Sequence, residues 1–363
     1  MCQKVAELIR RLKKNNFTTK VSAIFYVNTW HFLAKVLFLP NIKDIIMSVA
    51  SFLRENHSTA FSFELLPPLR GNSIEGLYNS VERLMQFSPA YINITTHRTD
   101  VVYRQTSPGI FQRTTERKRP GTVAIAAALK SRYGVPTVPH VICSGFTPAE
   151  LENELIDLSY LGITDLLVLR GDRAKGENRF EQTDGGYLHA VELCNQVSQF
   201  NRGVLLDGTS HNCMGEGFSF GVAGYPEKHE EAMNIETDVE YLKAKIDAGA
   251  EYVVTQMFFD NTKYFDFVSR CRAAGIYVPI IPGLKPLTSL TQQALLPKTF
   301  HIDLPMELAT ELRKCADNDS VKALGVEWAT MQARELRAAG VPSIHFYSMN
   351  AVASIEQIAK NVY

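Results

Sequence analysis

The sequence lacks an excess of charge of either sign, a pattern of paired cysteines and a long uninterrupted apolar stretch. Its 363 residues carry 38 basic and 38 acidic side chains, which gives no general attraction to nucleic acid or to anionic membranes. The six cysteines include no Cys-x-x-Cys pair and are typical of reduced thiols, rather than of a disulfide framework or a zinc site. We therefore expect a cytoplasmic protein with no metal site, no nucleic-acid partner and no membrane partner.

The chain does contain enough apolar material for a large core, with 45% hydrophobic residues. From residue 59 onward, a helix that ends at glycine and leads into a short apolar strand recurs, as at Tyr133-Gly134-Val135 and Ala248-Gly249-Ala250. We expect eight strands, at residues 60–64, 91–95, 137–143, 165–170, 218–223, 252–256, 278–282 and 344–347. Helices fill most gaps between them, with extra helical material between residues 288 and 338.

This repetition predicts an α/β fold, a (β/α)8 TIM barrel. An open, doubly wound sheet is the alternative, and it would need a glycine-rich nucleotide turn after its first strand. The first strand is followed by Leu65-Leu66-Pro67-Pro68, which is no such turn. The barrel is therefore the favoured architecture.

The first 57 residues do not follow the repeat, so we expect residues 1–57 to form an N-terminal extension and residues 58–363 to form the barrel. Residues 1–20 are basic and residues 21–40 are apolar, the order found in signal peptides and membrane anchors. Lys35 interrupts the apolar stretch and no small-residue cleavage site follows, which disfavours both. Two interpretations stay open: a loosely packed helical extension, or a natural start at Met47.

Polar side chains at the carboxyl ends of the strands form the active site in barrels of this kind. In the first strand Phe61 and Phe63 share one face, and Ser62 and Glu64 share the other. If the phenylalanines pack under the helices, Glu64 points into the barrel mouth, where lost hydration raises its pKa. It would then stay protonated and serve as a general acid. An ion pair with Arg70 or with a lysine of the barrel is the alternative interpretation.

Arg170-Gly171-Asp172 ends the fourth predicted strand. Glycine lets a ligand approach the backbone, arginine can bind a phosphate, and the aspartate can accept a hydrogen bond from a ring N–H. A surface turn with a local salt bridge explains the same residues. His140 is more typical of a core histidine than of a ligand. Residues 113–119 predict a basic loop, which is either solvated or attracts an anionic ligand tail.

Taken in order, the strand-end segments resemble the methylenetetrahydrofolate reductases, specifically the single-domain bacterial type. The matching segments are Phe61-Ser62-Phe63-Glu64-Leu65-Leu66-Pro67-Pro68, Pro139-His140-Val141-Ile142-Cys143, Leu169-Arg170-Gly171-Asp172, Ala223-Gly224-Tyr225-Pro226-Glu227-Lys228-His229, Asp247-Ala248-Gly249-Ala250, Thr255-Gln256-Met257-Phe258-Phe259-Asp260, Ile281-Pro282-Gly283 and His345-Phe346-Tyr347. The resemblance implies a (β/α)8 barrel with tightly bound FAD. It also implies ping-pong hydride transfer from NADH or NADPH to 5,10-methylenetetrahydrofolate, giving 5-methyltetrahydrofolate for methionine synthesis.

The resemblance also implies roles for individual residues. Glu64 is the general acid that protonates the folate nitrogen, Asp172 lies beside flavin and pterin, and Gln256 bonds the pterin edge. Gln292 is a further folate contact. The implied FAD contacts are Thr95, His140, Arg170, Gly171, Asp172, Tyr187, Tyr225, His229, Asp238 and Lys245. The sequence departs from the family at Leu65 and Leu66, where paired phenylalanines are usual, and at Ala351, where a basic residue is common.

Two other functions stay open. One is a flavin-dependent barrel of the proline-dehydrogenase type that acts on another carbon–nitrogen bond, and the other is a partner subunit that only binds. Gln256 and Asp172 favour a pterin, because they offer hydrogen bonds to a flat aminopyrimidine that proline lacks. Retention of Glu64 argues against a subunit without catalysis. We also expect a homo-oligomer.

Overall fold

The computed structural model describes residues 47–173, 177, 179–212, 217–349 and 351–363. The expected extension over residues 1–57 lies outside the described residues as far as residue 46. Its last part forms helix α4 (Val49–Glu55), which belongs to the same compact unit as the barrel, Ser48–Tyr363. No helix within the described ranges is both long and apolar enough to cross a membrane.

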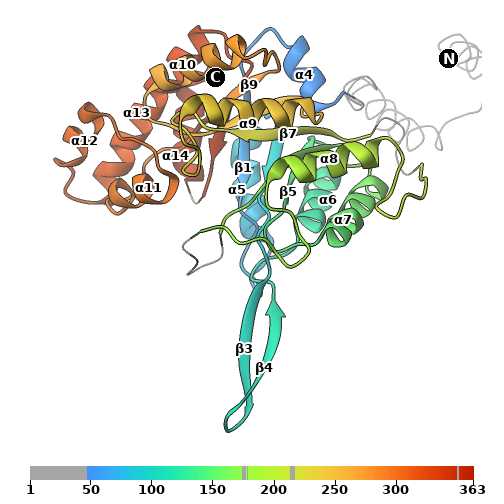
Figure 1. The fold of residues 1–363 in the computed structure, drawn as a ribbon. Coiled ribbons are helices and arrows are strands. Elements are labelled where there is room, and N and C mark those ends of the chain that lie inside the picture. Colours follow the sequence, from blue (N-terminus) through green and yellow to red (C-terminus); the bar gives the residue numbers. More distant parts are fainter. Residues whose placement is uncertain (1–46, 174–176, 178, 213–216, 350) are drawn as a thin grey trace, which may run out of the picture. The chain divides into compact units, whose positions relative to one another are not determined.

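Eight parallel strands close into a barrel, which confirms the fold that the sequence predicts (Figure 1). Around the barrel their order is β1, β10, β9, β8, β7, β6, β5 and β2. The strands are β1 (Ala60–Leu65), β2 (Tyr91–Ile94), β5 (Thr137–Ile142), β6 (Asp165–Leu169), β7 (Ser219–Gly224), β8 (Tyr252–Met257), β9 (Ile280–Leu284) and β10 (Ser343–Tyr347). The barrel closes where β1 pairs with β10, from Ala60 opposite Ser343 to Glu64 opposite Tyr347.

Helices surround the barrel. They are α5 (Glu75–Met85), α6 (Thr122–Tyr133), α7 (Pro148–Tyr160), α8 (Ala190–Asn201), α9 (Ile235–Asp247), α10 (Asn261–Ala273), α11 (Gln292–Phe300), α12 (Met306–Leu312), α13 (Asn318–Ala338) and α14 (Val352–Val362). Helices α11, α12 and α13 supply the extra helical material expected between residues 288 and 338. Helix α7 begins with a capping box between Thr147 and Glu150, because the threonine and glutamate side chains satisfy N–H groups that have no partner within the helix.

Two apolar clusters leave one end of the barrel free for polar side chains. The outer core lies between strands and helices and includes Phe61 and Phe63 of β1. A second cluster fills the barrel interior with residues such as Leu167 and is joined by Leu53 of α4. Helix α4 sits at the amino ends of the strands, because the N–H of Val49 donates to Asp165, the first residue of β6. The polar interior therefore lies toward the carboxyl ends.

Two strands between β2 and α6 were not predicted. Strands β3 (Asp100–Ser107) and β4 (Ile110–Glu116) form an antiparallel hairpin that projects from the barrel (Figure 1). The expected basic loop over residues 113–119 is therefore wrong in its first part, which belongs to β4. Cross-strand backbone hydrogen bonds order this segment, and its charge alone gives no sign of them.

Candidate active site at the carboxyl end of the barrel

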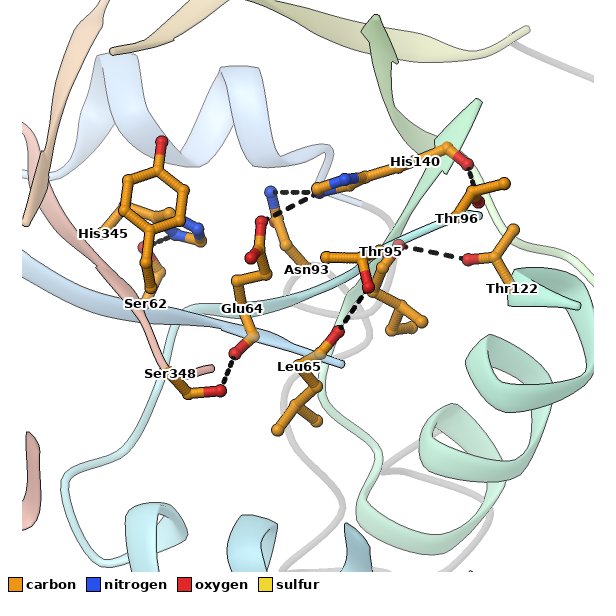
Figure 2. A network of polar contacts seen from close by, with 12 residues as sticks. Ser62, Glu64, Leu65, Asn93, Thr95, Thr96, Thr122, His140, His345 and Ser348 are labelled. Carbon is orange, nitrogen blue, oxygen red and sulfur yellow. Dashed lines mark hydrogen bonds and ion pairs between the residues drawn. The ribbon is translucent and has the colours of Figure 1, made fainter. Parts of the chain in front are cut away.

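Glu64 lies near the carboxyl end of β1 and points into the barrel (Figure 2). The residue is only 8% exposed, and Oε2 of its side chain lies 3.7 Å from Nε2 of His140 on β5. Lys285 and Asp172 are its other charged neighbours. The alternation of faces read from the sequence is confirmed, because Phe61 and Phe63 belong to the outer core.

Burial is the main cause that raises the pKa of Glu64, to about 8. Lys285 acts in the opposite direction, and the negative charge of Asp172 adds to the rise. The carboxyl is therefore largely protonated near neutral pH, as the sequence analysis expected. Arg70 and a barrel lysine were the two alternative ion-pair partners of Glu64. Arg70 instead pairs with Glu116, with Nη1 2.8 Å from Oε1. A lysine of the barrel, Lys285, does lie near Glu64.

The two histidines in the barrel interior are neutral. Burial, with a smaller effect of His97, lowers the pKa of His140 to about 3. Burial, with a smaller effect of His140, lowers the pKa of His345 to about 3. Asn93 lies 3.4 Å from Nε2 of His140, and Ser62 Oγ lies 3.0 Å from Nδ1 of His345 (Figure 2). These rings shape the interior and carry no charge near pH 7.

A second polar cluster lies at the ends of β6 and β7. The Arg170 guanidinium forms a two-pronged ion pair with Glu231, in which Nη2 lies 3.1 Å from Oε1. The same guanidinium stacks 4.5 Å above the centre of the Phe180 ring. Tyr225 packs edge-on against His229 with ring centres 4.7 Å apart. This combination of one cation and several rings suits an anionic ligand with a planar group.

Asp238 and Asp172 also belong to this polar cluster at the ends of β6 and β7. The N–H of His229 donates to Asp238 at 3.0 Å, and burial raises the pKa of that carboxyl. Asp172 is a charged neighbour of both Tyr225 and Glu64, so it connects the two clusters. The structure thus brings together Glu64, His140, Arg170, Asp172, Tyr225, His229 and Asp238 from strand ends far apart in the sequence.

Gly171 shows why Asp172 is held where it is. Its φ is +83°, and a Cβ there would lie 2.9 Å from Cβ of Ser144. The hydroxyl of Ser144 donates to the backbone carbonyl of Asp172 at 2.8 Å. Any larger residue at position 171 would be strained and would push this turn away from the barrel mouth.

Most of the remaining predicted site residues bond to backbone groups nearby. Thr95 donates to the carbonyl of Leu65, and Gln256 accepts from the N–H of Met257. Gln292 accepts from the N–H of Thr288 within its own loop. On α9, Nζ of Lys245 donates to the carbonyl of Ala223 at 2.6 Å. Tyr187 is half-buried against the outer core. No contact in the described residues joins Gln292, Lys245 or Tyr187 directly to Glu64.

Lys285 is the residue that the sequence analysis missed. It directly follows β9, is only 4% exposed, and is a charged neighbour of Glu64. The strand was expected to end at residue 282, so the lysine fell outside the strand-end residues that were considered. A lysine immediately after the apolar run Ile280–Leu284 was the available signal, since strand ends carry the chemistry of a barrel.

Comparisons with known proteins identify the family to which the chain belongs. A model of the methylenetetrahydrofolate reductase family matches residues 49–363. The chain is 30% identical over 331 residues to methylenetetrahydrofolate reductase (NADH) 1 of Arabidopsis thaliana, which covers 88% of this chain and 50% of that protein. It is 31% identical over 304 residues to a probable methylenetetrahydrofolate reductase (NADPH) of Caenorhabditis elegans, covering 83% of this chain and 42% of that protein. The chain thus spans about half the length of these relatives.

The match to a bacterial relative covers most of both proteins. The chain is 31% identical over 290 residues to 5,10-methylenetetrahydrofolate reductase of Escherichia coli, covering 80% of this chain and 86% of that protein. Among solved structures, a Clostridium thermocellum protein that binds two copies of 5-methyl-5,6,7,8-tetrahydrofolic acid aligns with a TM-score of 0.52. That alignment covers 85% of this chain and 96% of that one at 17% identity, which shows a shared fold.

Proposed function

Because the chain belongs to the methylenetetrahydrofolate reductase family, we propose that it reduces 5,10-methylenetetrahydrofolate to 5-methyltetrahydrofolate with NADH or NADPH and bound FAD. The observation that carries the proposal is Glu64, a buried carboxyl that is largely protonated near neutral pH and faces the barrel mouth. A reaction that opens a carbon–nitrogen bridge needs such a proton donor. The product would supply methyl groups for methionine synthesis in the cytoplasm.

The polar cluster at the ends of β6 and β7 would hold FAD. When bound, FAD would carry the hydride from nicotinamide to folate. Arg170 would exchange Glu231 for a phosphate, because carboxylate and phosphate offer the same pair of acceptor oxygens to a guanidinium. Tyr225 and His229 would supply ring contacts. The further proposed contacts are Thr95, His140, Gly171, Asp172, Tyr187, Asp238 and Lys245.

The proton step belongs to Glu64. Its O–H bond would break as an N–H bond forms on the folate nitrogen and the methylene bridge opens. Asp172 lies next to Glu64 and would accept a hydrogen bond from the pterin ring, while Gln256 at the end of β8 would bond the pterin edge. Gln292 would contact the folate further out, from the start of α11.

The two half-reactions test this proposal separately. The bound flavin is reduced anaerobically with NADH or NADPH and is then reoxidised with methylenetetrahydrofolate, and each rate is measured by flavin absorbance. Glu64→Gln should slow reoxidation by about 100- to 10,000-fold and leave reduction by nicotinamide nearly unchanged. Because the acid form is active, the reoxidation rate should fall as the pH rises through about 8.

Glu154→Gln is the matched control, since Glu154 is a carboxyl on α7, outside the barrel, whose pKa burial raises to about 7. It should leave both half-reactions unchanged. Equal losses in both half-reactions of Glu64→Gln would contradict the role of Glu64. A purified protein that is colourless and does not take up added FAD would contradict the flavin proposal and would favour a subunit that only binds.

A further inference from the structure

We propose that Lys285 is the charge partner of Glu64, the cation that balances the carboxylate left when Glu64 gives up its proton. This inference rests on the proposed function of Glu64 as a general acid. It deepens that function by assigning a role to a residue outside the set that the sequence suggested.

Strand register places the two side chains on the same level of the barrel. Phe63, Phe346 and Leu284 lie side by side on β1, β10 and β9, and all three are buried in the outer core. One residue further come Glu64 of β1, Tyr347 of β10 and Lys285, which directly follows the last residue of β9. Because successive side chains point to opposite faces, this second row points into the barrel. Glu64 and Lys285 therefore flank Tyr347 from its two sides.

Both side chains of the pair are removed from water, with exposures of 8% for Glu64 and 4% for Lys285. Burial lowers the pKa of the lysine to about 8, and Glu64 acts in the opposite direction. Lys285 is therefore largely charged at pH 7. A cation in a desolvated pocket stabilises a nearby carboxylate more strongly than it would in water.

The other groups around the pair do not supply that positive charge. Besides Lys285, the titratable and charged neighbours of Glu64 are His140, Asp172 and Tyr347. The groups next to these three are Tyr91, His97, Tyr225 and His345, and Arg119 lies beside His97. His140 is near Glu64 but neutral, and Asp172 is negative. Arg119 acts on His97 and donates to the carbonyl of Pro67. Among the described residues, Lys285 is the neighbour whose charge lowers the pKa of Glu64.

This arrangement compensates the charge that proton donation leaves in a buried site. Before the step the pair carries one positive charge, on Lys285. When the Glu64 O–H bond breaks and the folate N–H bond forms, the pair becomes neutral overall, as a carboxylate beside an ammonium. Without Lys285 the carboxylate would be left uncompensated, so Glu64 would hold its proton more tightly and would be a weaker acid.

Infrared titration of the protonated Glu64 carbonyl, identified as the band lost in Glu64→Gln, tests the pair without any substrate. Lys285→Met should raise the midpoint of this band by about 1–3 pH units, whereas Lys285→Arg should stay close to the wild type. Lys298→Met, on the exposed side of α11, is the control and should leave the midpoint unchanged. An unchanged midpoint in Lys285→Met would overturn the proposal.

The flavin reoxidation rate gives a second readout. In Lys285→Met its maximum should fall about tenfold while its alkaline limb moves to higher pH, because a weaker acid donates more slowly and ionises later. If Lys285→Met does not fold, nitrogen NMR of the Lys285 ammonium in Glu64→Gln replaces it. Loss of the carboxylate should lower the lysine midpoint, and an unchanged midpoint would refute the pairing. If the titration midpoint shifts as expected but the protein never reduces folate, the pairing of Glu64 with Lys285 is supported and the proposed function is rejected.

Discussion

Replacing Gly325 by alanine should destabilise the protein, although alanine is the better helix former. Gly325 lies within α13, where glycine costs about 1 kcal/mol relative to alanine. A Cβ at this position would lie 2.2 Å from the carbonyl oxygen of Leu287 and 2.8 Å from its nitrogen. These are backbone atoms of the segment that carries Lys285, so they cannot rotate away as a side chain can.

The size of the effect follows from this approach. To restore ordinary contact distances, α13 and the Leu287 segment must separate by roughly 1 Å. Overpacking of this kind costs about 1–3 kcal/mol. Because the added Cβ would meet backbone atoms of Leu287, which cannot move aside as a side chain can, we expect the upper end of that range. Subtracting the gain in helix propensity of about 1 kcal/mol leaves a net loss of about 2 kcal/mol, or about 3–5 °C in Tm.

Calorimetry and urea denaturation measure this loss, with Gly76→Ala as the control. Gly76 lies in α5, and a Cβ there would meet nothing within 4 Å, so this change should stabilise the protein by about 0.4–1 kcal/mol. On the proposed function, the Gly325 variant should also bind methylenetetrahydrofolate more weakly, since Lys285 and the proposed folate contact Gln292 lie on either side of Leu287. A Gly325→Ala protein as stable as the wild type would refute the reasoning.

Two further outcomes concern stability. The pKa of Glu64 is raised from 4.5 to about 8 on folding, so the wild type should lose stability relative to Glu64→Gln as the pH rises from about 4.5 to 8. Urea midpoints of both proteins across that range measure this, and parallel curves would contradict it. Leu53→Ala should cost about 2–5 kcal/mol, because Leu53 is 3% exposed within the apolar cluster that fills the barrel interior. The same change at Leu69, which is 51% exposed, should shift the urea midpoint little.

The sequence predicted the barrel because its strands are distinct apolar runs separated by helices with clear ends. Buried parallel strands such as Leu166–Leu169 need apolar side chains on both faces, and few other structures produce that pattern. The direction of Glu64 was predictable for a related reason, since two phenylalanines fixed the outer face of β1. Local composition therefore determined both the architecture and the first candidate acid.

Features that depend on distant contacts were not predictable in this way. The hairpin of β3 and β4 has exposed residues such as Tyr103 and Phe111 on its surface, so burial did not mark its strands. The position of Lys285 beside Glu64 depends on the register of β9 with β10, and β10 lies about 60 residues later in the chain. The pairing of Arg170 with Glu231 likewise joins two loops that no local pattern connects.

The pairing of β1 with β10 has a consequence for synthesis of the protein. Ala60 and Ser343 are 283 residues apart, and their strands are neighbours in the closed barrel. At about 5–20 residues per second, a ribosome needs roughly 15–55 s to make the partner of β1 after β1 itself. Throughout that interval an apolar strand has one edge without a hydrogen-bonding neighbour, so the nascent chain presents a site for aggregation until the barrel closes.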